Sequence, residues 1–194
     1  MKEVKNWGTI WKVIDKGLKD TNREDLWKSS VIYPNSSGFT RILNEIKPEI
    51  VVELGTYRGL STVILAFMCE KVYTYDIIYQ KDTEFLWELF KVKNSIEYFY
   101  CGPQRDFPIP TEEFLILVRK YRPIIKQAID DLEYFDFAVI DTYHDYENVK
   151  ADFELVKRCG KVLFHDWRDS FPQIGKFMKE IGATKRGEFG YWEK

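Results

Sequence analysis

Acidic and imidazole side chains end four of the five short apolar runs that we interpret as parallel strands. They are Glu53, Asp76, Asp141, and the pair His165 and Asp166. Because ligands of open α/β sheets bind beyond the carboxyl ends of the strands, these groups are expected to meet at one site. Carboxylates attract cations and accept hydrogen bonds from hydroxyls, and histidine exchanges protons near neutral pH. Any one of them could be an ordinary solvent-exposed strand end, but four such ends together favour a ligand site.

The stretch "ELGTYRG" places Glu53 directly before two glycines, Gly55 and Gly59. It lacks the spacing of a dinucleotide site and the ending of a P-loop, and a carboxylate at its mouth would repel a pyrophosphate. A ligand with a cationic end, ribose hydroxyls and no phosphate suits this edge better, and S-adenosylmethionine has all three properties. Its carboxylate could meet backbone N–H groups at the start of the next helix. Arg58 could reach that carboxylate or stay solvated.

The elements that must position these residues alternate along the chain. Runs rich in Val, Ile, Tyr and Phe predict strands, and each is followed by a segment of helical periodicity. The predicted strands are 49–54, 71–78, 95–101, 134–141 and 160–166, and the predicted helices are 59–70, 82–93, 112–129, 146–159 and 173–182. This alternation predicts an α/β fold with a parallel sheet covered on both faces. The tail 183–194 predicts an antiparallel hairpin, and Pro123 is expected to kink or split its helix.

No repeat, low-complexity tract or linker marks a boundary, so residues 1–194 are expected to form a single domain. Residues 1–49 contain tryptophans at helical intervals, at Trp7, Trp11 and Trp27. A turn cluster "YPNSSG" follows at 33–38, and a further helix is predicted at 39–49. We interpret this segment as a helical lead-in that could lid the site or bury the interface of a homodimer.

The charge balance disfavours nucleic acid as the main partner. The chain has 29 Lys plus Arg against 31 Asp plus Glu, so it carries no basic excess for a phosphate backbone. It has neither an apolar signal core nor a run of transmembrane length, which predicts a soluble, cytoplasmic protein without a membrane partner. Cys69, Cys101 and Cys159 form no C-x-x-C pair, so they predict neither a disulfide framework nor a cysteine zinc site.

Three segments resemble a known family. The stretches "VVELGTYRGLST", "VYTYDI" and "FDFAVIDTYHDYENVKADFELVKRCGKVLFHDW" are similar to class I S-adenosylmethionine-dependent methyltransferases, closest to the small O-methyltransferase-like branch (methyltransferase domain 24-like). The resemblance implies a Rossmann-like three-layer sandwich, with a mostly parallel seven-stranded sheet and an antiparallel C-terminal hairpin. It also implies methyl transfer from S-adenosylmethionine to a small-molecule acceptor, with a hydroxyl oxygen as the expected target.

The resemblance implies a set of cofactor-binding residues. They are Glu53, Gly55, Thr56, Gly59, Ser61, Asp76, Gly102 and Asp141. The first five match the family's first motif and its polar neighbours. Asp76 matches the acid that binds the ribose hydroxyls, with a strand-end turn residue as the alternative. In the stretch "CGPQ" only Gly102 matches the family's adenine contact.

The stretch "IDTYHDYENV" resembles a further family motif. In metal-dependent members an acid at the position of Asp141 and two residues after the fifth strand hold Mg²⁺, which implies Asp141, His165 and Asp166 here. Histidine is an unusual ligand for this hard cation. Either His144 or His165 could act as the catalytic base that removes the proton of an acceptor hydroxyl. The alternatives are that His144 caps the following helix and that His165 is a satisfied core residue.

Other interpretations stay open. Tyr143 and Trp167 could wall an acceptor pocket or pack beneath the lead-in. A non-catalytic module that binds the cofactor or a partner would keep the same fold. A nicotinamide-dependent oxidoreductase is disfavoured by the glycine spacing. A nucleic-acid methyltransferase is disfavoured by the balanced charge and by the lack of an Asn-Pro-Pro-Tyr-like motif.

Overall fold

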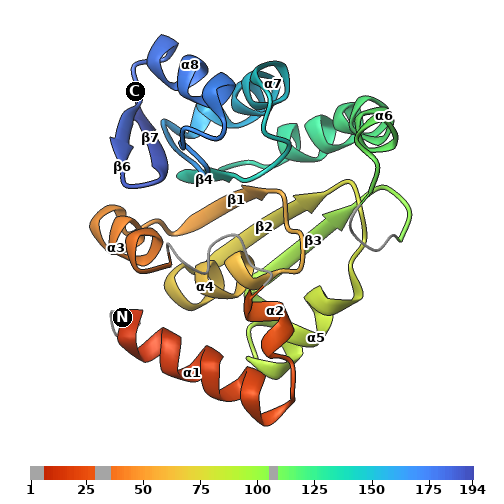
Figure 1. Ribbon diagram of the computed structural model, residues 1–194, viewed down its shortest axis with the longest axis vertical. Helices are drawn as coiled ribbons and strands as arrows, with labels where there is room; N and C mark the ends of the chain where they lie inside the picture. The colour runs from red at the N-terminus through yellow and green to blue at the C-terminus, as the bar shows by residue number, and fades with distance from the viewer. Residues whose placement is uncertain (1–6, 29–35, 105–108) are drawn as a thin grey trace.

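The computed structural model describes residues 7–28, 36–104 and 109–194, whose strands form one seven-stranded sheet (Figure 1). The strands are β1 (Ile50–Leu54), β2 (Lys71–Asp76), β3 (Ile96–Tyr100), β4 (Phe137–Ile140), β5 (Lys161–Phe164), β6 (Thr184–Arg186) and β7 (Phe189–Glu193). Their order is β3-β2-β1-β4-β5-β7-β6. β1 to β5 pair in parallel, whereas β7 pairs antiparallel with β5 and β6. The predicted sheet with its C-terminal hairpin is confirmed.

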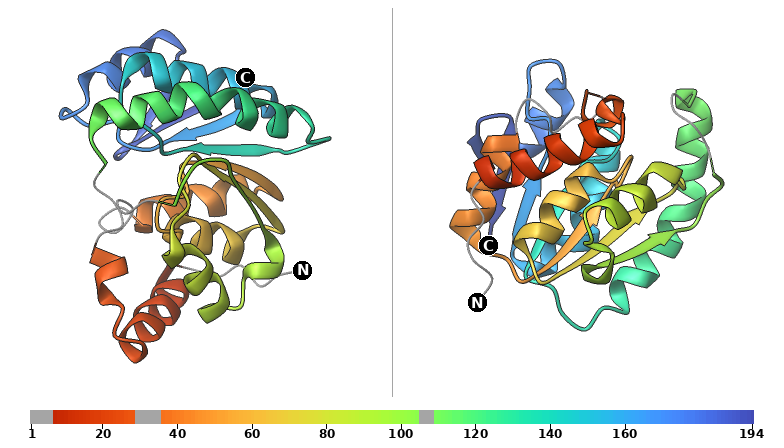
Figure 2. Two further views of the ribbon diagram at one scale, coloured as in Figure 1. Left: turned by 90° about the vertical axis from the view of Figure 1, so that its right-hand side faces the viewer. Right: turned by 90° about the horizontal axis from the view of Figure 1, so that it is seen from below.

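Helices cover both faces of the sheet, as the turned views show (Figure 2). One face carries α1 (Trp7–Asp20), α2 (Glu24–Lys28), α3 (Ser36–Ile46), α4 (Leu60–Met68) and α5 (Lys81–Leu89). The other carries α6 (Thr111–Asp130), α7 (Tyr146–Val156) and α8 (Pro172–Glu180). Short 3₁₀ turns, η2 (Lys93–Ser95) and η3 (Lys157–Cys159), precede β3 and β5. The architecture is the predicted three-layer sandwich.

The strands form because successive side chains enter opposite helical layers. In β1, Val51 packs into the layer of α1 to α5 and Val52 into the layer of α6 to α8. In β5, Leu163 packs into the first layer and Phe164 into the second. Full burial of each such side chain stabilises the fold by about 1.5 to 3 kcal/mol. Both sides of the sheet are therefore core, and the strand ends are left for the site.

The lead-in helix α1 is part of this core. Ile10, Ile14 and Leu18 recur at helical spacing and are almost fully buried. A methyl group built on Gly17 would lie 2.6 Å from the Phe90 ring, so α1 packs closely against the end of α5. Its apolar face is covered within the chain, and a homodimer stays a prediction. The side chains of Trp7 and Trp27 and the turn residues 33–35 lie outside the described part.

The predicted bounds of one helix are wrong, and of the two alternatives for Pro123 a split of its helix is excluded. Residues 36–38 belong to the first turn of α3, and this helix ends at Ile46, because Lys47 precedes Pro48 and takes a left-handed backbone conformation, with φ of 53°. Helix α6 runs unbroken through Pro123. Its buried stripe of Val118, Ile125 and Ile129 holds the helix together although one backbone hydrogen bond is lost.

The strand order reverses between β1 and β4, which is where ligands bind in sheets of this kind. The loops that follow β1, β2 and β4 meet there. Among the described helices, none has both the length and the apolarity needed to cross a bilayer.

Candidate functional site

A cavity of about 310 Å³ opens at the carboxyl ends of β1, β2 and β4. This volume lies at the lower end of the range for small-molecule sites, about 300 to 1,000 Å³. The predicted site residues that line it are Gly55, Gly59, Ser61, Asp76, Asp141 and His144. The others, Glu53, Thr56, Gly102, His165 and Asp166, lie behind or beside the lining. Six of the eleven predicted residues therefore line one cavity.

The glycine loop has its shape because two positions require glycine. Gly55 and Gly59 have φ of +94° and +84°, a left-handed conformation that side chains rarely adopt. A methyl group built on Gly55 would lie 2.0 Å from the carbonyl oxygen of Asp141. The loop after β1 and the loop after β4 are thus in direct backbone contact.

Glu53 lies beneath this loop with no exposed area. Its Oε2 accepts hydrogen bonds from the hydroxyls of Thr62 and Thr74, each at 2.6 Å. The Thr74 hydroxyl lies 2.6 Å from that of Thr56, and Thr56 must donate because the Thr74 proton is already used. Burial raises the pKa of Glu53 to about 7 despite these hydroxyls. Glu53 and Thr56 therefore support the loop from inside and do not face the cavity.

Asp76 ends β2 and lines the cavity. One carboxylate oxygen accepts the N–H of Tyr57 at 2.8 Å, and the other accepts the N–H of Ile78 at 3.0 Å. Burial raises the pKa of Asp76 to about 6, against the effect of these backbone groups. The ionised side chain is an acceptor only, so it can also accept hydrogen bonds from hydroxyls of a ligand in the cavity.

The two arginines of the lining are already paired with aspartates. Arg58 contacts Asp82 at 2.7 Å and Asp25 of α2 at 3.3 Å. The Arg58 side chain is only a quarter exposed, so it is not a solvated loop tip. Its charge is used to link α2 to the glycine loop and is not free for a cofactor carboxylate. Arg122 of α6 contacts Asp152 at 3.0 Å. No arginine or lysine of the described residues pairs with Asp76, so the lining favours a cationic ligand.

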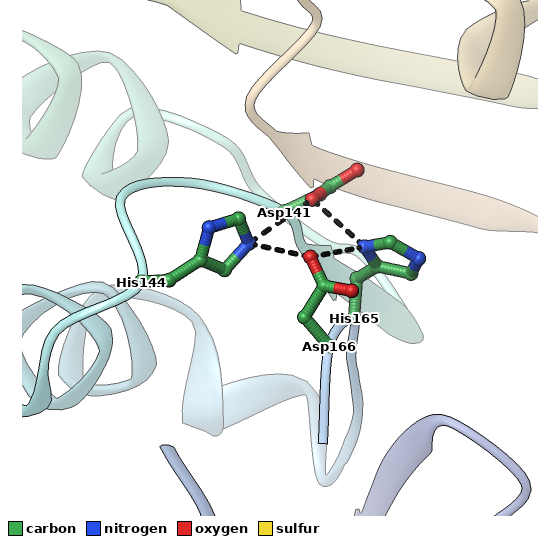
Figure 3. Close-up of side chains that lie close together, drawn as sticks. All are labelled: Asp141, His144, His165 and Asp166. Atoms are coloured by element: carbon green, nitrogen blue, oxygen red, sulfur yellow. Dashed lines mark hydrogen bonds and ion pairs between the residues drawn. The ribbon is translucent and has the colours of Figure 1, made fainter. Parts of the chain in front are cut away.

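Asp141, His144, His165 and Asp166 form a compact group, here called the His–Asp cluster (Figure 3). Asp141 follows β4, His144 lies in the loop before α7, and the other two follow β5. One nitrogen or oxygen of each residue lies within 4.8 Å of those of the other three. The side chains of His165 and Asp166 are 1% and 2% exposed, whereas those of Asp141 and His144 are 13% and 26% exposed. The cluster thus forms part of the cavity wall and extends into the interior.

Charges within the cluster stabilise one another. Burial opposes the charged forms, but the two carboxylates raise the pKa of His144 to about 9 and that of His165 to about 10. The imidazoles in turn lower the pKa of Asp141 to about 2 and that of Asp166 below its usual range. Without a bound cation both imidazoles are protonated at neutral pH, and a protonated imidazole cannot accept a proton.

The structure decides between the alternatives for the two histidines. The cap of α7 is Asp145, whose side chain accepts the N–H of Asn148 at 2.8 Å, so His144 does not cap this helix. His165 is buried, and its Nδ1 lies 3.2 Å from an oxygen of Asp141. Its Nε2 has no hydrogen-bond partner among the described residues. His165 is therefore not a fully satisfied core residue.

The remaining predicted positions separate. Tyr143 lines the cavity and its ring lies 5.5 Å from that of Phe114. Trp167 lies outside the cavity lining and packs against Gly175 and Gly190, so it does not wall the cavity. A methyl group built on Gly102 would lie 1.8 Å from the carbonyl oxygen of Ile77, so this glycine serves backbone packing.

Sequence reasoning missed the apolar wall of the cavity. It is formed by Ile77, Ile109, Phe114, Val118, Ile125 and Leu155. Phe114, Val118 and Ile125 recur at helical spacing, which was a usable signal. The same spacing is typical of any helix face that packs on a core, so it could not identify a ligand site.

Comparison with known proteins agrees with this geometry. A family model described as a methyltransferase domain matches residues 52–167, more than half of the chain. The chain belongs to this methyltransferase domain family. The matched part of the methyltransferase domain contains the glycine loop, Asp76 and the whole His–Asp cluster. Comparison with curated protein sequences gives no match.

Solved structures of similar fold include three methyltransferases. The O-methyltransferase from Bacillus cereus in complex with S-adenosylhomocysteine has 17% identity and a TM-score of 0.62, over 94% of this chain and 91% of that one. TomG from Streptomyces achromogenes, an O-methyltransferase in complex with S-adenosylmethionine, has 12% identity and a TM-score of 0.57, over 89% and 78%. MycE from the mycinamycin pathway, in complex with Mg and S-adenosylhomocysteine, has 12% identity and a TM-score of 0.58, over 93% and 53%. At such identities the likeness shows that this methyltransferase domain has their fold.

Proposed function

We propose that this methyltransferase domain transfers the methyl group of S-adenosylmethionine to a hydroxyl oxygen of a small molecule. The observation that carries the proposal is the single cavity where the two-glycine loop, Asp76 and Asp141 meet while both arginines of the lining are paired with aspartates. A ligand with a cationic centre and a ribose diol suits such a lining, and a pyrophosphate does not.

The residues present fit S-adenosylmethionine. Asp76 would accept hydrogen bonds from the ribose hydroxyls, because it lines the cavity at the end of β2 and a carboxylate has about four acceptor positions. The N-terminus of α4, at Leu60 and Ser61, lines the cavity and would receive the ligand's carboxylate. Ile77 and Phe114 offer apolar surface to the adenine.

When bound, S-adenosylmethionine supplies a methyl group on a positively charged sulfur, and the acceptor oxygen displaces the thioether. The protein's part is to hold the acceptor in line with that methyl group and to keep water away. The cavity of about 310 Å³ has the size of a small-molecule site, which supports a small acceptor. His144 is the histidine that lines it, so His144 and not His165 is in place to contact the acceptor hydroxyl. Because its pKa is raised to about 9, the His144 imidazole would be protonated when the cluster holds no cation, and it would then donate a hydrogen bond to the acceptor hydroxyl.

Calorimetric titration with S-adenosylhomocysteine tests cofactor binding. We expect binding to the wild type and to Asp169→Asn, an exposed aspartate outside the cavity, and weaker binding to Asp76→Asn. Loss of a hydrogen bond to a charged group costs about 1.5 to 3 kcal/mol, which is about 10- to 150-fold in affinity. Binding of NAD in preference to S-adenosylhomocysteine would overturn the proposal.

Incubation with methyl-labelled S-adenosylmethionine and a panel of hydroxylated small molecules tests the transfer itself. Label in an ether product supports O-methyl transfer. Tight cofactor binding without transfer to any acceptor would instead favour a non-catalytic binding module of the same fold.

A further inference from the structure

We infer that the His–Asp cluster is a binding site for a divalent first-row transition metal ion, such as Mn²⁺, Fe²⁺, Co²⁺ or Zn²⁺, and not for Mg²⁺. All four residues, including His144, would be ligands. The inference concerns cation binding alone and does not depend on methyl transfer.

The donor atoms of the cluster do not fit Mg²⁺. This ion is bound by oxygen ligands in near-ideal octahedral geometry and keeps several of its waters. Half of the donors here are imidazole nitrogens, from His144 and His165. Imidazole together with carboxylate is a typical donor set for Zn²⁺, Fe²⁺ and their neighbours in the first row. The expectation of Mg²⁺ at Asp141, His165 and Asp166 is therefore not supported by the chemistry of this site.

The four donor atoms face one another at separations that suit a shared ion (Figure 3). Nε2 of His144 and Nδ1 of His165 lie 2.9 and 3.0 Å from the same oxygen of Asp166. They lie 3.8 and 3.2 Å from one oxygen of Asp141. Ligands held about 2.1 Å from a metal are separated by about 3.0 Å at right angles and about 3.4 Å in a tetrahedron. Small side-chain movements would bring all four to such distances.

The contact between His144 and Asp166 does not have hydrogen-bond geometry. Nε2 of His144 is buried and has no hydrogen-bond partner among the described residues, although an oxygen of Asp166 is 2.9 Å away. A buried polar atom without a partner calls for an explanation, and an absent ion is one. Two ligands of one metal face each other in this way, because both lone pairs point at the ion.

The charges and supports of the cluster also suit a dication. Two carboxylates and two neutral imidazoles carry a charge of about −2, which one divalent ion neutralises. Asp166 has a left-handed backbone, with φ of 63°, which is costly for a non-glycine residue and recurs at functional sites. Its other oxygen lies 2.8 Å from Nε of Arg168, an ion pair on the side away from the two histidines.

The first test is calorimetric titration of the EDTA-treated protein with Mn²⁺, Co²⁺, Zn²⁺ and Mg²⁺ separately. We expect one transition metal ion per chain, bound at least about tenfold more tightly than Mg²⁺. Loss of a residue that only supports a metal ligand weakens metal binding by about 10- to 100-fold. His144→Ala and Asp141→Asn each remove a ligand, so each should weaken metal binding by more than that. Both residues are partly exposed, so the variants should fold. Asp82→Asn, an aspartate outside the cluster, should bind like the wild type.

A spectroscopic test identifies the ligands, because the two histidines of the chain are both in the cluster. Pulsed electron paramagnetic resonance of bound Cu²⁺ should show two imidazole nitrogens in the wild type and one in His144→Ala. No bound cation, Mg²⁺ binding as tight as Mn²⁺ binding, or bound Cu²⁺ without imidazole would each overturn the inference. Since no cofactor is present in these tests, a failure to bind S-adenosylhomocysteine would leave their result unchanged.

Discussion

Carboxylates on the two sides of the strand reversal are held in opposite ways. On the side of β1 and β2, Glu53 and Asp76 are bonded to hydroxyls and backbone N–H groups, and burial raises their pKa values to about 7 and about 6. On the side of β4 and β5, Asp141 and Asp166 face imidazoles, which lower their pKa values. Uncharged donors only partly replace the lost hydration of a carboxylate, whereas a nearby cation more than replaces it. Four carboxyl groups at the same edge of the sheet therefore differ in how readily they lose a proton.

The largest effect is expected from a substitution that separates the loop after β1 from the loop after β4. In Gly55→Ala the methyl group would lie 2.0 Å from the carbonyl oxygen of Asp141, at a φ of +94°. We expect a loss of about 3 to 5 kcal/mol in the free energy of unfolding, the sum of backbone strain and overpacking. Denaturant unfolding measures it. Gly160→Ala is the matched control, because Gly160 has φ of +80° with nothing within 4 Å, and should cost only about 1 to 2 kcal/mol. Equal losses would mean that the close approach is unimportant.

The next largest effect is expected for Glu53→Gln. The folded-state pKa of about 7 lies above the ordinary value of 4.5, so the folded state favours the protonated acid. The stability that Glu53 contributes should therefore be fully present below pH 4.5 and be lost as the pH rises through 7, about 3 kcal/mol in total. Unfolding curves across this range should fall less steeply in Glu53→Gln, where the raised pKa of Asp76 still gives a slope, and as steeply as the wild type in Glu133→Gln, an exposed position. A wild-type stability that rises with pH in this range would contradict the assignment.

A smaller effect is expected in the pH dependence of ligand binding. Asp76 must be ionised to accept hydrogen bonds with both oxygens, and its pKa is about 6. The affinity for S-adenosylhomocysteine should be constant above that pH and fall as the pH drops through 6, approaching tenfold per unit. Calorimetry of the wild type and of Asp76→Asn should show the fall only in the wild type. The same fall in both proteins would assign it to another group.

The smallest effect is expected at the link between the lead-in and the glycine loop. Asp25 of α2 is 53% exposed and contacts Arg58 at 3.3 Å. Exposed ion pairs contribute about 0 to 1 kcal/mol, so Asp25→Asn should change the stability by less than about 1 kcal/mol. A markedly weaker affinity for S-adenosylhomocysteine at unchanged stability would show that α2 acts on the site as a lid.

The sequence was sufficient to predict the sheet and the polar wall of the cavity, which the glycine loop and the acids at the strand ends form. Period-2 burial, as at Val51 and Val52, and strand ends such as Asp76 are local features, so the strands and their terminal acids could be located. The match to the methyltransferase family could also be seen in the short motifs around Gly55 and Gly59.

Side-chain direction could not be predicted, because it depends on neighbours distant in the sequence. Thr56 belongs to the glycine loop yet turns inward to Thr74 of the next strand. Trp167 directly follows Asp166 yet packs on Gly190 of β7, away from the cavity. His144 joins Asp166 only because the loops after β4 and β5 lie side by side. Such pairings arise from the packing of separate loops, and spacing within one motif does not contain them.

The backbone contact at Gly55 links the two sides of the site mechanically. Since no side chain separates this loop from Asp141, the gap between them is fixed by main-chain atoms, which yield far less than side chains do. Any ligand that shifts one loop must shift the other. Thermodynamic reciprocity then requires that a molecule held by the glycine loop and an ion held by the His–Asp cluster change each other's affinity by the same factor.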